Sequence, residues 1–228
     1  MDKSLLSLFQ LCDSNFPSGG FSHSFGLETF VQFDKVHDPD TFSQWLELFL
    51  NEQMVSADGL AIQIAYEALE NDNLDKLWEM DHLLTIQNMS RETREGTKYM
   101  GRSMVKIADA IYDIENISLY KDRVKEKKSF AHTAIVFAII GHHLKISKEE
   151  TILYYLYTTV INLVQNAVRA IPIGQTAGQK IISDFQPKLI KAVEAIGQLE
   201  QQDFGTIAPG LELAQMQHER VNVRIFMS

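Results

Sequence analysis

Two segments of the chain are apolar on almost every side: FAHTAIVFAII at residues 130–140 and TILYYLYTTVINLV at residues 151–164. A helix that is apolar all round lies in the interior of a fold, because none of its faces is suited to water. Ser147 and Glu150 precede the second segment with the spacing of a capping box, which satisfies free N–H groups at the start of a helix. We therefore predict two central apolar helices.

Amphipathic helices are predicted around this centre. Pro39 follows Asp38 at a favoured first-turn position. The next apolar residues recur at helical spacing, namely Phe42, Trp45, Leu46, Phe49 and Leu50. The same period continues through residues 61–69 and 74–84. Since no repeat, low-complexity tract or linker interrupts the chain, we predict an all-α, single-domain helical bundle over residues 1–228.

The composition argues against several classes of function. The 228 residues carry a formal net charge of −9, whereas a general nucleic-acid binder or a protein held on anionic lipid needs an excess of Lys and Arg. The single cysteine, Cys12, cannot form an internal disulfide or a cysteine-based zinc site. The N-terminus does not read as a secretory signal, and no run of about 18 apolar residues could span a membrane. We predict a cytoplasmic protein without nucleic-acid or membrane partners.

The stretch NFPSGGFSHSFGLE, residues 15–28, is rich in Gly and Ser. It does not complete a phosphate-binding loop, because Leu27 stands where that motif needs Lys. It does not complete a nucleophile elbow, because Ser24 stands where that motif needs Gly. We interpret the stretch as a turn that shapes the chain through its proline and glycines, Pro17, Gly19, Gly20 and Gly26.

A second turn is predicted in NAVRAIPIGQTAGQK, residues 166–180. Pro172 prevents the central helix from simply continuing, and Gly174 and Gly178 frame the polar residues that follow. One interpretation is a helix kink whose polar side chains bond the backbone. The other is a polar recognition surface formed by Arg169, Gln175, Gln179 and Lys180.

The segment SRETREGTKYMGRSM, residues 90–104, has the mixed charges of a helix face that is solvated and paired along its own length. Gly96 and Gly101 are unusual within it, because each costs about 1 kcal/mol relative to Ala in a helix. Close packing of another element against this helix would offset that cost.

The last segment, HERVNVRIFMS at residues 218–228, differs from the rest of the chain. Val221, Val223 and Ile225 alternate with polar residues, and this period of two is typical of an extended segment. A helical domain offers such a segment no sheet to join. We therefore predict a tail that is ordered by a partner, or by a groove of the protein's own dimer.

Metal ligands are sparse in the sequence. Glu79 and His82 match the E-x-x-H half-motif of di-iron helix bundles, but such a site needs a second half-motif and two further carboxylates. No second half-motif is present. A metalloenzyme that uses Glu79 and His82 is therefore an alternative hypothesis, and His218 is a weak candidate for a transient metal contact.

Four stretches together resemble the urease accessory protein UreF family. They are LFQLCDSNFPSGGFSHSFGLE (8–28), TREGTKYMGRSM (93–104), AVRAIPIGQTAGQK (167–180) and APGLELAQMQHERVNVRIFMS (208–228). They follow the order of the family's motifs and span nearly the whole chain. The sequence departs from the family pattern at Met227, where a basic residue is expected, and at Lys180, which stands for Arg.

The resemblance implies an all-α homodimer that is not an enzyme but a component of a nickel-insertion chaperone. It implies binding to UreD (also called UreH), largely through the C-terminal part, recruitment of the GTPase UreG with control of its GTP hydrolysis, and delivery of nickel to the urease apoprotein. It implies no tightly bound cofactor, with nickel only in transit. The residues expected to bind partners are Glu28, Arg169, Gln175, Gln179, Lys180, His218, Glu219, Arg220 and Arg224. A purely structural homo-oligomer remains a further alternative.

Overall fold

The computed structural model of the chain describes residues 3–13, 15–205 and 208–228. The first residues of the predicted domain, and Ser14 within the opening motif, lie outside the described residues. The described parts contain helices and no strand, which confirms the all-α prediction. None of the helices within these ranges is long and apolar enough to cross a membrane.

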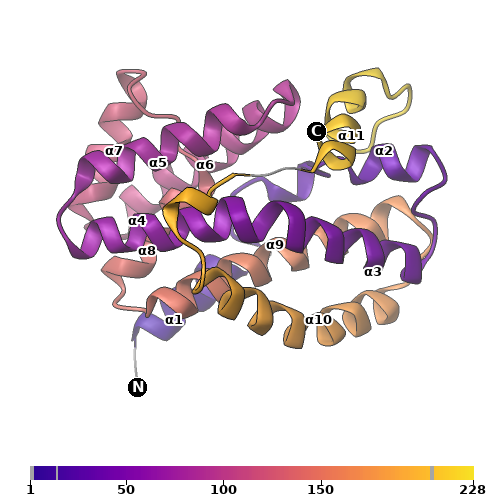
Figure 1. Cartoon of the computed structure of the whole chain (residues 1–228), viewed down its shortest axis with the longest axis horizontal. Helices are drawn as coiled ribbons and strands as arrows, with labels where there is room; N and C mark the ends of the chain where they lie inside the picture. The colour runs from indigo at the N-terminus through magenta and orange to yellow at the C-terminus, as the bar shows by residue number, and fades with distance from the viewer. Residues whose placement is uncertain (1–2, 14, 206–207) are drawn as a thin grey trace.

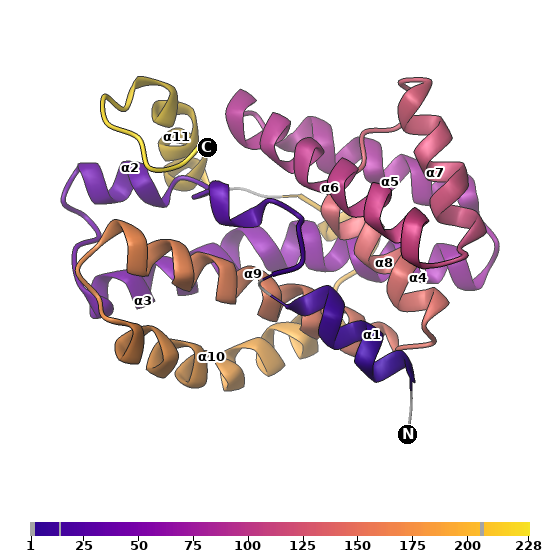
Figure 2. The same cartoon turned by 180° about the vertical axis from the view of Figure 1, so that it is seen from behind.

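The helices follow one another with short connections. In chain order they are α1 (Lys3–Cys12), η1 (Gly20–Ser22), α2 (Leu27–Gln32), α3 (Pro39–Leu48), η2 (Phe49–Gly59), α4 (Leu60–Glu70), α5 (Leu74–Gln87), α6 (Arg91–Ile111), α7 (Glu115–Lys125), α8 (Thr133–His143), α9 (Lys148–Ala170), α10 (Gln175–Ile196), η3 (Gln201–Asp203), α11 (Pro209–Gln217) and η4 (His218–Arg220). Figures 1 and 2 show α5, α6 and α7 together at one end of the molecule, and α2 and α11 at the other. The C-terminus lies beside α11 in both views.

The two apolar segments form α8 and α9, but they are buried to different degrees. Every residue of α8 from Thr133 to Gly141 is buried, as a helix that is apolar all round requires. Helix α9 buries only part of its circumference, with Leu153, Tyr154 and Ile161 partly exposed. The predicted capping box at Ser147 is present. The sequence therefore overstated the burial of the second central helix.

The helix that begins at Pro39 changes its winding. Asp38 caps α3 with Thr41 in a capping box, as its position before Pro39 suggested. Residues 49–59 then form the π-helix η2, which is wider than an α-helix and brings residues five apart onto one side. Gly59 lets α10 approach η2, because a Cβ there would lie 2.4 Å from Cδ1 of Ile196. Neither the long π-helix nor its consequences follow from the apolar spacing.

The two glycines of α6 are explained by close contacts. A Cβ on Gly96 would lie 2.6 Å from the ring of His23, and one on Gly101 would lie 1.6 Å from the carbonyl oxygen of Ala131. Both distances are far shorter than a carbon atom tolerates. Gly96 therefore admits the opening turn and Gly101 admits the segment before α8, and these contacts offset the poor helix propensity of glycine.

Candidate partner-docking site

His218 joins three parts of the fold. Its side chain is fully buried in η4, with Nδ1 2.7 Å from Oε2 of Glu92 on α6 and Nε2 2.9 Å from Oε2 of Glu28 on α2. Both ring nitrogens are therefore engaged in hydrogen bonds within this cluster. Neither nitrogen keeps a lone pair for a metal ion. The weak prediction of a metal contact at His218 is therefore not what this geometry supports.

Glu28 holds the C-terminal tail. It is 3% exposed, and its two oxygens accept hydrogen bonds from the backbone N–H groups of Ile225 at 2.6 Å and Phe226 at 3.1 Å. Hydrogen bonds to an ionised acceptor are among the stronger ones in proteins. Glu28 was predicted to face a partner protein, but it faces the chain's own tail. The correction has a simple physical reason, since a buried carboxylate must be satisfied within the fold.

Glu92 completes the cluster from the side of α6. Its Oε1 accepts from Nη1 of Arg224 at 2.8 Å, while its other oxygen accepts from His218. Burial by itself would raise the pKa of the Glu92 carboxyl, but the hydrogen bonds from His218 and Arg224 hold that pKa below its usual value. The sequence placed Glu92 in a solvated helix face, and nothing in its spacing distinguished it from its charged neighbours.

The end of the tail is fixed against the opening turn. The carbonyl oxygen of Ser228 accepts from the backbone N–H of Ser24 at 2.5 Å, and its Oγ lies 2.8 Å from Nδ1 of His23. The N–H of Met227 donates to the carbonyl oxygen of Ser22 at 2.8 Å. Burial and the nearby charge of His218 lower the pKa of His23.

Arg169 connects the end of α9 to both the turn and the tail. Its guanidinium lies 4.9 Å from the ring centre of buried Phe226, a cation–π contact. Its Nη1 donates to the carbonyl oxygen of Phe21 at 2.7 Å. The opening stretch, the end of α9 and the tail, which are far apart in sequence, therefore form one structure. Two glycines shape the turn in the left-handed conformation, Gly19 with φ 90° and Gly26 with φ 91°.

The tail makes all of these contacts with its own chain, whereas its ordering by a partner or a dimer groove stays a prediction. The alternation of Val223 and Ile225 with Asn222 and Arg224 does not correspond to burial, because all four residues are exposed. Phe226 and Ser228 are buried, while Val223 is 72%, Ile225 49% and Met227 67% exposed. Leu213 and Met216 of α11 are exposed as well. Protein-binding surfaces commonly contain exposed apolar side chains on an ordered backbone.

The other predicted polar residues lie on the surface. Gln175, Gln179 and Lys180 are exposed at the start of α10 and make no hydrogen bond or ion pair with the described part of the chain. The kink interpretation, in which these side chains bond the backbone, does not apply to them. Gly174 is the N-cap of α10, and nothing lies within 4 Å of a Cβ built there. Gly178 packs closely, because its Cβ would lie 3.1 Å from Val168.

Near the tail, Glu219 and Arg220 are exposed. Glu219 accepts from Nε of Arg91 at 3.1 Å, which ties η4 to the start of α6 from outside. The proposed E-x-x-H ligands have other neighbours: Glu79 pairs with Lys76 at 2.8 Å, and the ring of His82 lies 5.5 Å from that of Phe130. Within the ranges that the structure describes, no three His, Cys, Asp or Glu side chains are grouped to hold a metal ion. The geometry therefore does not favour the metalloenzyme alternative.

Fold and site define an all-α domain with its C-terminal tail docked on a buried cluster of Glu28, Glu92 and His218. A family model described as UreF matches residues 36–186. The chain is also 50% identical over 224 residues to "Urease accessory protein UreF" of Bacillus sp. (strain TB-90), which covers 98% of this chain and 99% of that protein. The chain belongs to the UreF family of urease accessory proteins, as the four motifs predicted.

Proposed function

We propose that the protein acts in urease maturation as a component of the nickel-insertion chaperone. In this role it binds the scaffold protein UreD/UreH, recruits the GTPase UreG and modulates GTP hydrolysis while nickel is loaded into the urease apoprotein. It acts in the cytoplasm as a homodimer, and nickel is in transit rather than tightly bound. Membership of the UreF family supports this proposal.

The observation that carries the proposal is the docked tail. Glu28, Glu92 and His218 fix its backbone, and three apolar side chains, Val223, Ile225 and Met227, remain exposed on it. Burial of apolar surface contributes about 25 cal/mol per Å². Because these contacts already hold the tail to its own chain, little of that gain is lost to the ordering of a flexible segment. The tail is therefore suited to bind the scaffold protein.

The exposed residues at the start of α10 suit a different contact. Gln175, Gln179 and Lys180 are polar and unpaired within the described chain. Polar, incompletely dehydrated contacts are typical of transient complexes, whereas apolar contacts dominate permanent ones. We assign this second surface to the GTPase, which must bind and leave during each cycle, and we assign Glu219 and Arg220, which adjoin the tail, to the contact with the scaffold protein.

The test is urease activation in cells that carry the urease subunits and the other accessory proteins. Without this chain we expect urease to stay free of nickel, and with it to become active. The double variant Val223→Asp/Ile225→Asp should fail to restore activity, because it places charges in the proposed scaffold contact. Full urease activity without the chain would contradict the role in maturation.

A matched control separates loss of docking from a general effect of surface charge. Ile111 is 45% exposed in the last turn of α6. Arg91, in the first turn of the same helix, pairs with Glu219 beside the tail. A helix rises 1.5 Å per residue, so Ile111 lies about 30 Å along α6 from Arg91. Ile111→Asp should support activation like the wild type. Equal loss with Ile111→Asp and with the tail variant would show that the tail has no special part.

A further inference from the structure

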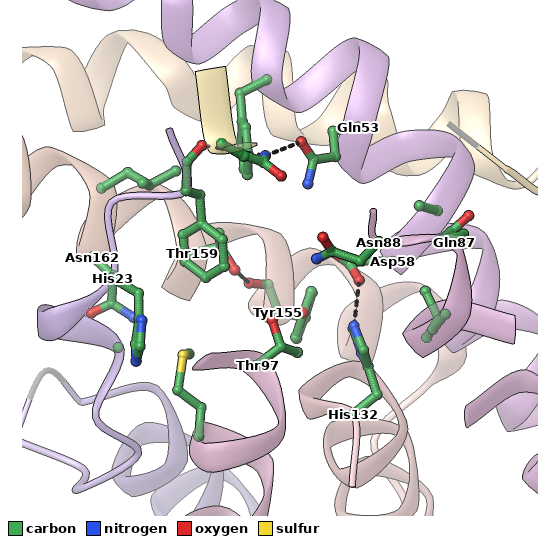
Figure 3. Close-up of a pocket in the computed structure, with 18 of the residues that line it drawn as sticks. His23, Gln53, Asp58, Gln87, Asn88, Thr97, His132, Tyr155, Thr159 and Asn162 are labelled. Carbon is green, nitrogen blue, oxygen red and sulfur yellow. Dashed lines mark hydrogen bonds and ion pairs between the residues drawn. The ribbon is translucent and has the colours of Figure 1, made fainter. Parts of the chain in front are cut away.

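A cavity of about 80 Å³ lies between the π-helix and the helices around it. It is lined by Gln53 and Asp58 of η2, His132 at the start of α8, Tyr155 of α9 and Gln215 of α11, among others. Figure 3 shows Asp58 and His132 facing each other across it. Its volume suffices for a small number of water molecules.

Asp58 has no cation beside it in this cavity. The other titratable groups that line it are His23 from the opening turn, His132, Tyr155, and Glu212 from α11, and none of the described lining residues is Lys or Arg. The Asp58 side chain is 19% exposed, and a carboxylate that is largely removed from water without a counter-ion is disfavoured. Burial raises the pKa of Asp58 to about 7.

His132 does not serve as that counter-ion. Its Nδ1 accepts from the backbone N–H of Ala134 at 3.3 Å, so the neutral ring carries its proton on Nε2. Nε2 lies 3.7 Å from Oδ1 of Asp58, beyond hydrogen-bond distance. Burial lowers the pKa of His132 to about 3, and the ring is neutral at physiological pH. The same tautomer leaves Nε2 without a lone pair for a metal ion.

The polar atoms that line the cavity are suited to bind water. Oε1 of Gln87, Oδ1 of Asn88 and Nε2 of His23 are buried, line it and have no hydrogen-bond partner among the residues that the structure describes. Buried polar atoms in a cavity of this kind are normally satisfied by water. An ionised Asp58 would draw further water toward the same space, since no Lys or Arg lines the described part of the cavity.

The π-helix connects Asp58 to the docking site. Gln53, five residues before Asp58, faces the same cavity and accepts from Nε2 of Gln215 at 2.9 Å. Gln215 belongs to α11, whose carbonyl groups are held by Ser90 at 3.1 Å and by Thr29 at 2.8 Å. Helix α11 continues into η4 and the tail. A long π-helix is intrinsically less stable than an α-helix, so it depends on the contacts around it.

We propose that Asp58 is a proton switch for the π-helical segment 49–59: with a neutral carboxyl the segment is closed on the cavity, and on ionisation it opens, breaks the Gln53–Gln215 contact and loosens α11 and the tail. The switch makes the docking surface respond to pH near neutrality. It is a property of the purified chain and does not depend on the proposed role in urease maturation.

Hydrogen exchange of the purified protein tests the switch. Between about pH 6 and about pH 8.5, we expect protection factors in residues 49–59 and 209–217 to fall by about 10-fold, the ratio that linkage allows for a pKa of 3.8 in the open segment and about 7 in the closed one. Asp58→Asn should abolish this change, and Asp75→Asn, an exposed acid on α5, should retain it. Constant protection in the wild type, or a fall that persists in Asp58→Asn, would overturn the proposal.

A second measurement keeps the proposal testable if Asp58→Asn does not fold. In the wild type, the carbon resonance of the Asp58 carboxyl can be followed by NMR together with the amides of residues 49–59. We expect both to titrate with one midpoint near neutral pH. Titration of Asp58 in the ordinary range of aspartate, or amides that do not follow it, would also overturn the proposal.

Discussion

His218 and Glu28 are separated by 190 residues in the sequence and meet at 2.9 Å in the interior of the protein. Because the same ring also binds Glu92, a single side chain connects α2, α6 and the segment that leads into the tail. The carboxylate of Glu28 then binds the tail backbone directly. The tail is therefore positioned by a charge cluster inside the domain rather than by its own conformational preference.

Removal of the Glu28 carboxylate should release the tail. Glu28→Ala leaves the ring of His218 with one carboxylate and leaves two backbone N–H groups without their acceptor. Breaking a buried ion pair on one side typically costs about 3–5 kcal/mol. We expect the free energy of unfolding in urea to fall by about that amount, and residues 221–228 to become sensitive to protease.

An exposed ion pair in the same region provides the comparison. Glu219 pairs with Arg91, and both side chains are well exposed. Glu219→Ala should change the free energy of unfolding by no more than about 1 kcal/mol, since solvent screens such pairs. Similar losses for Glu28→Ala and Glu219→Ala would refute the view that the buried cluster holds the tail.

Asp58 and His132 should give stability opposite dependences on pH. The pKa of Asp58 rises from 3.8 to about 7 on folding, so the native state binds the extra proton and stability falls as pH rises through that range. The pKa of His132 falls from 6.5 to about 3, so the unfolded state binds the proton and stability rises with pH. Between about pH 4 and pH 6.5 the two effects oppose each other.

Single variants should reveal separately how Asp58 and His132 make the free energy of unfolding depend on pH. In Asp58→Asn the free energy of unfolding should rise with pH relative to the wild type, by up to about 1.4 kcal/mol per pH unit. In His132→Gln it should fall with pH relative to the wild type, by a similar amount. Urea unfolding at several pH values measures both. Parallel curves for the wild type and both variants would contradict the assignment of these two groups as buried and neutral.

The glycine at the contact between α6 and the segment before α8 should not tolerate a side chain. A Cβ on Gly101 would lie 1.6 Å from the carbonyl oxygen of Ala131, and backbone must move to admit it. Overpacking of this kind costs about 1–3 kcal/mol or more, so we expect Gly101→Ala to lower the melting temperature clearly. Gly210, in the first turn of α11, has nothing within 4 Å of its Cβ position. Gly210→Ala should be neutral or slightly stabilising.

Replacement of the polar residues at the start of α10 should weaken partner binding without changing the stability of the fold. The triple variant Gln175→Ala/Gln179→Ala/Lys180→Ala removes side chains that have no partner in the described chain. Changes at such surface sites usually lie within about 0.5 kcal/mol of the wild type. We expect unchanged unfolding and reduced retention of UreG by the complex with UreD/UreH. Normal retention of UreG would remove this surface from the proposal.

The helices of the core were largely predictable because buried helices have a characteristic local pattern of apolar residues. The run around Phe137 is apolar at every position, and the spacing of Phe42, Trp45 and Leu46 has the period of a helix. The π-helix was not predictable in this way. Gln53 and Asp58 are five residues apart and would diverge on an α-helix, and only the folded structure, with residues of α9 and α11 around them, shows that they share a cavity.

The docking site was predicted in its segments but not in its contacts. The period of two in the tail does not divide residues 222–225 by exposure, because Asn222 and Arg224 are exposed together with Val223 and Ile225. The binding of the tail to Glu28 depends on a carboxylate almost 200 residues away. Such long-range pairs produce no recognisable pattern of spacing in a single sequence. For this reason the sequence indicated Glu28 and His218 as exposed recognition residues.

The central claim is that the docked tail presents the surface that binds the scaffold protein. Co-expression of the tagged chain with UreD/UreH, followed by affinity purification, measures that contact directly. We expect Val223→Asp/Ile225→Asp to recover the folded chain with little or no UreD/UreH, and Ile111→Asp to recover the complex in wild-type amounts. Recovery of UreD/UreH with the tail variant in wild-type amounts would contradict the claim.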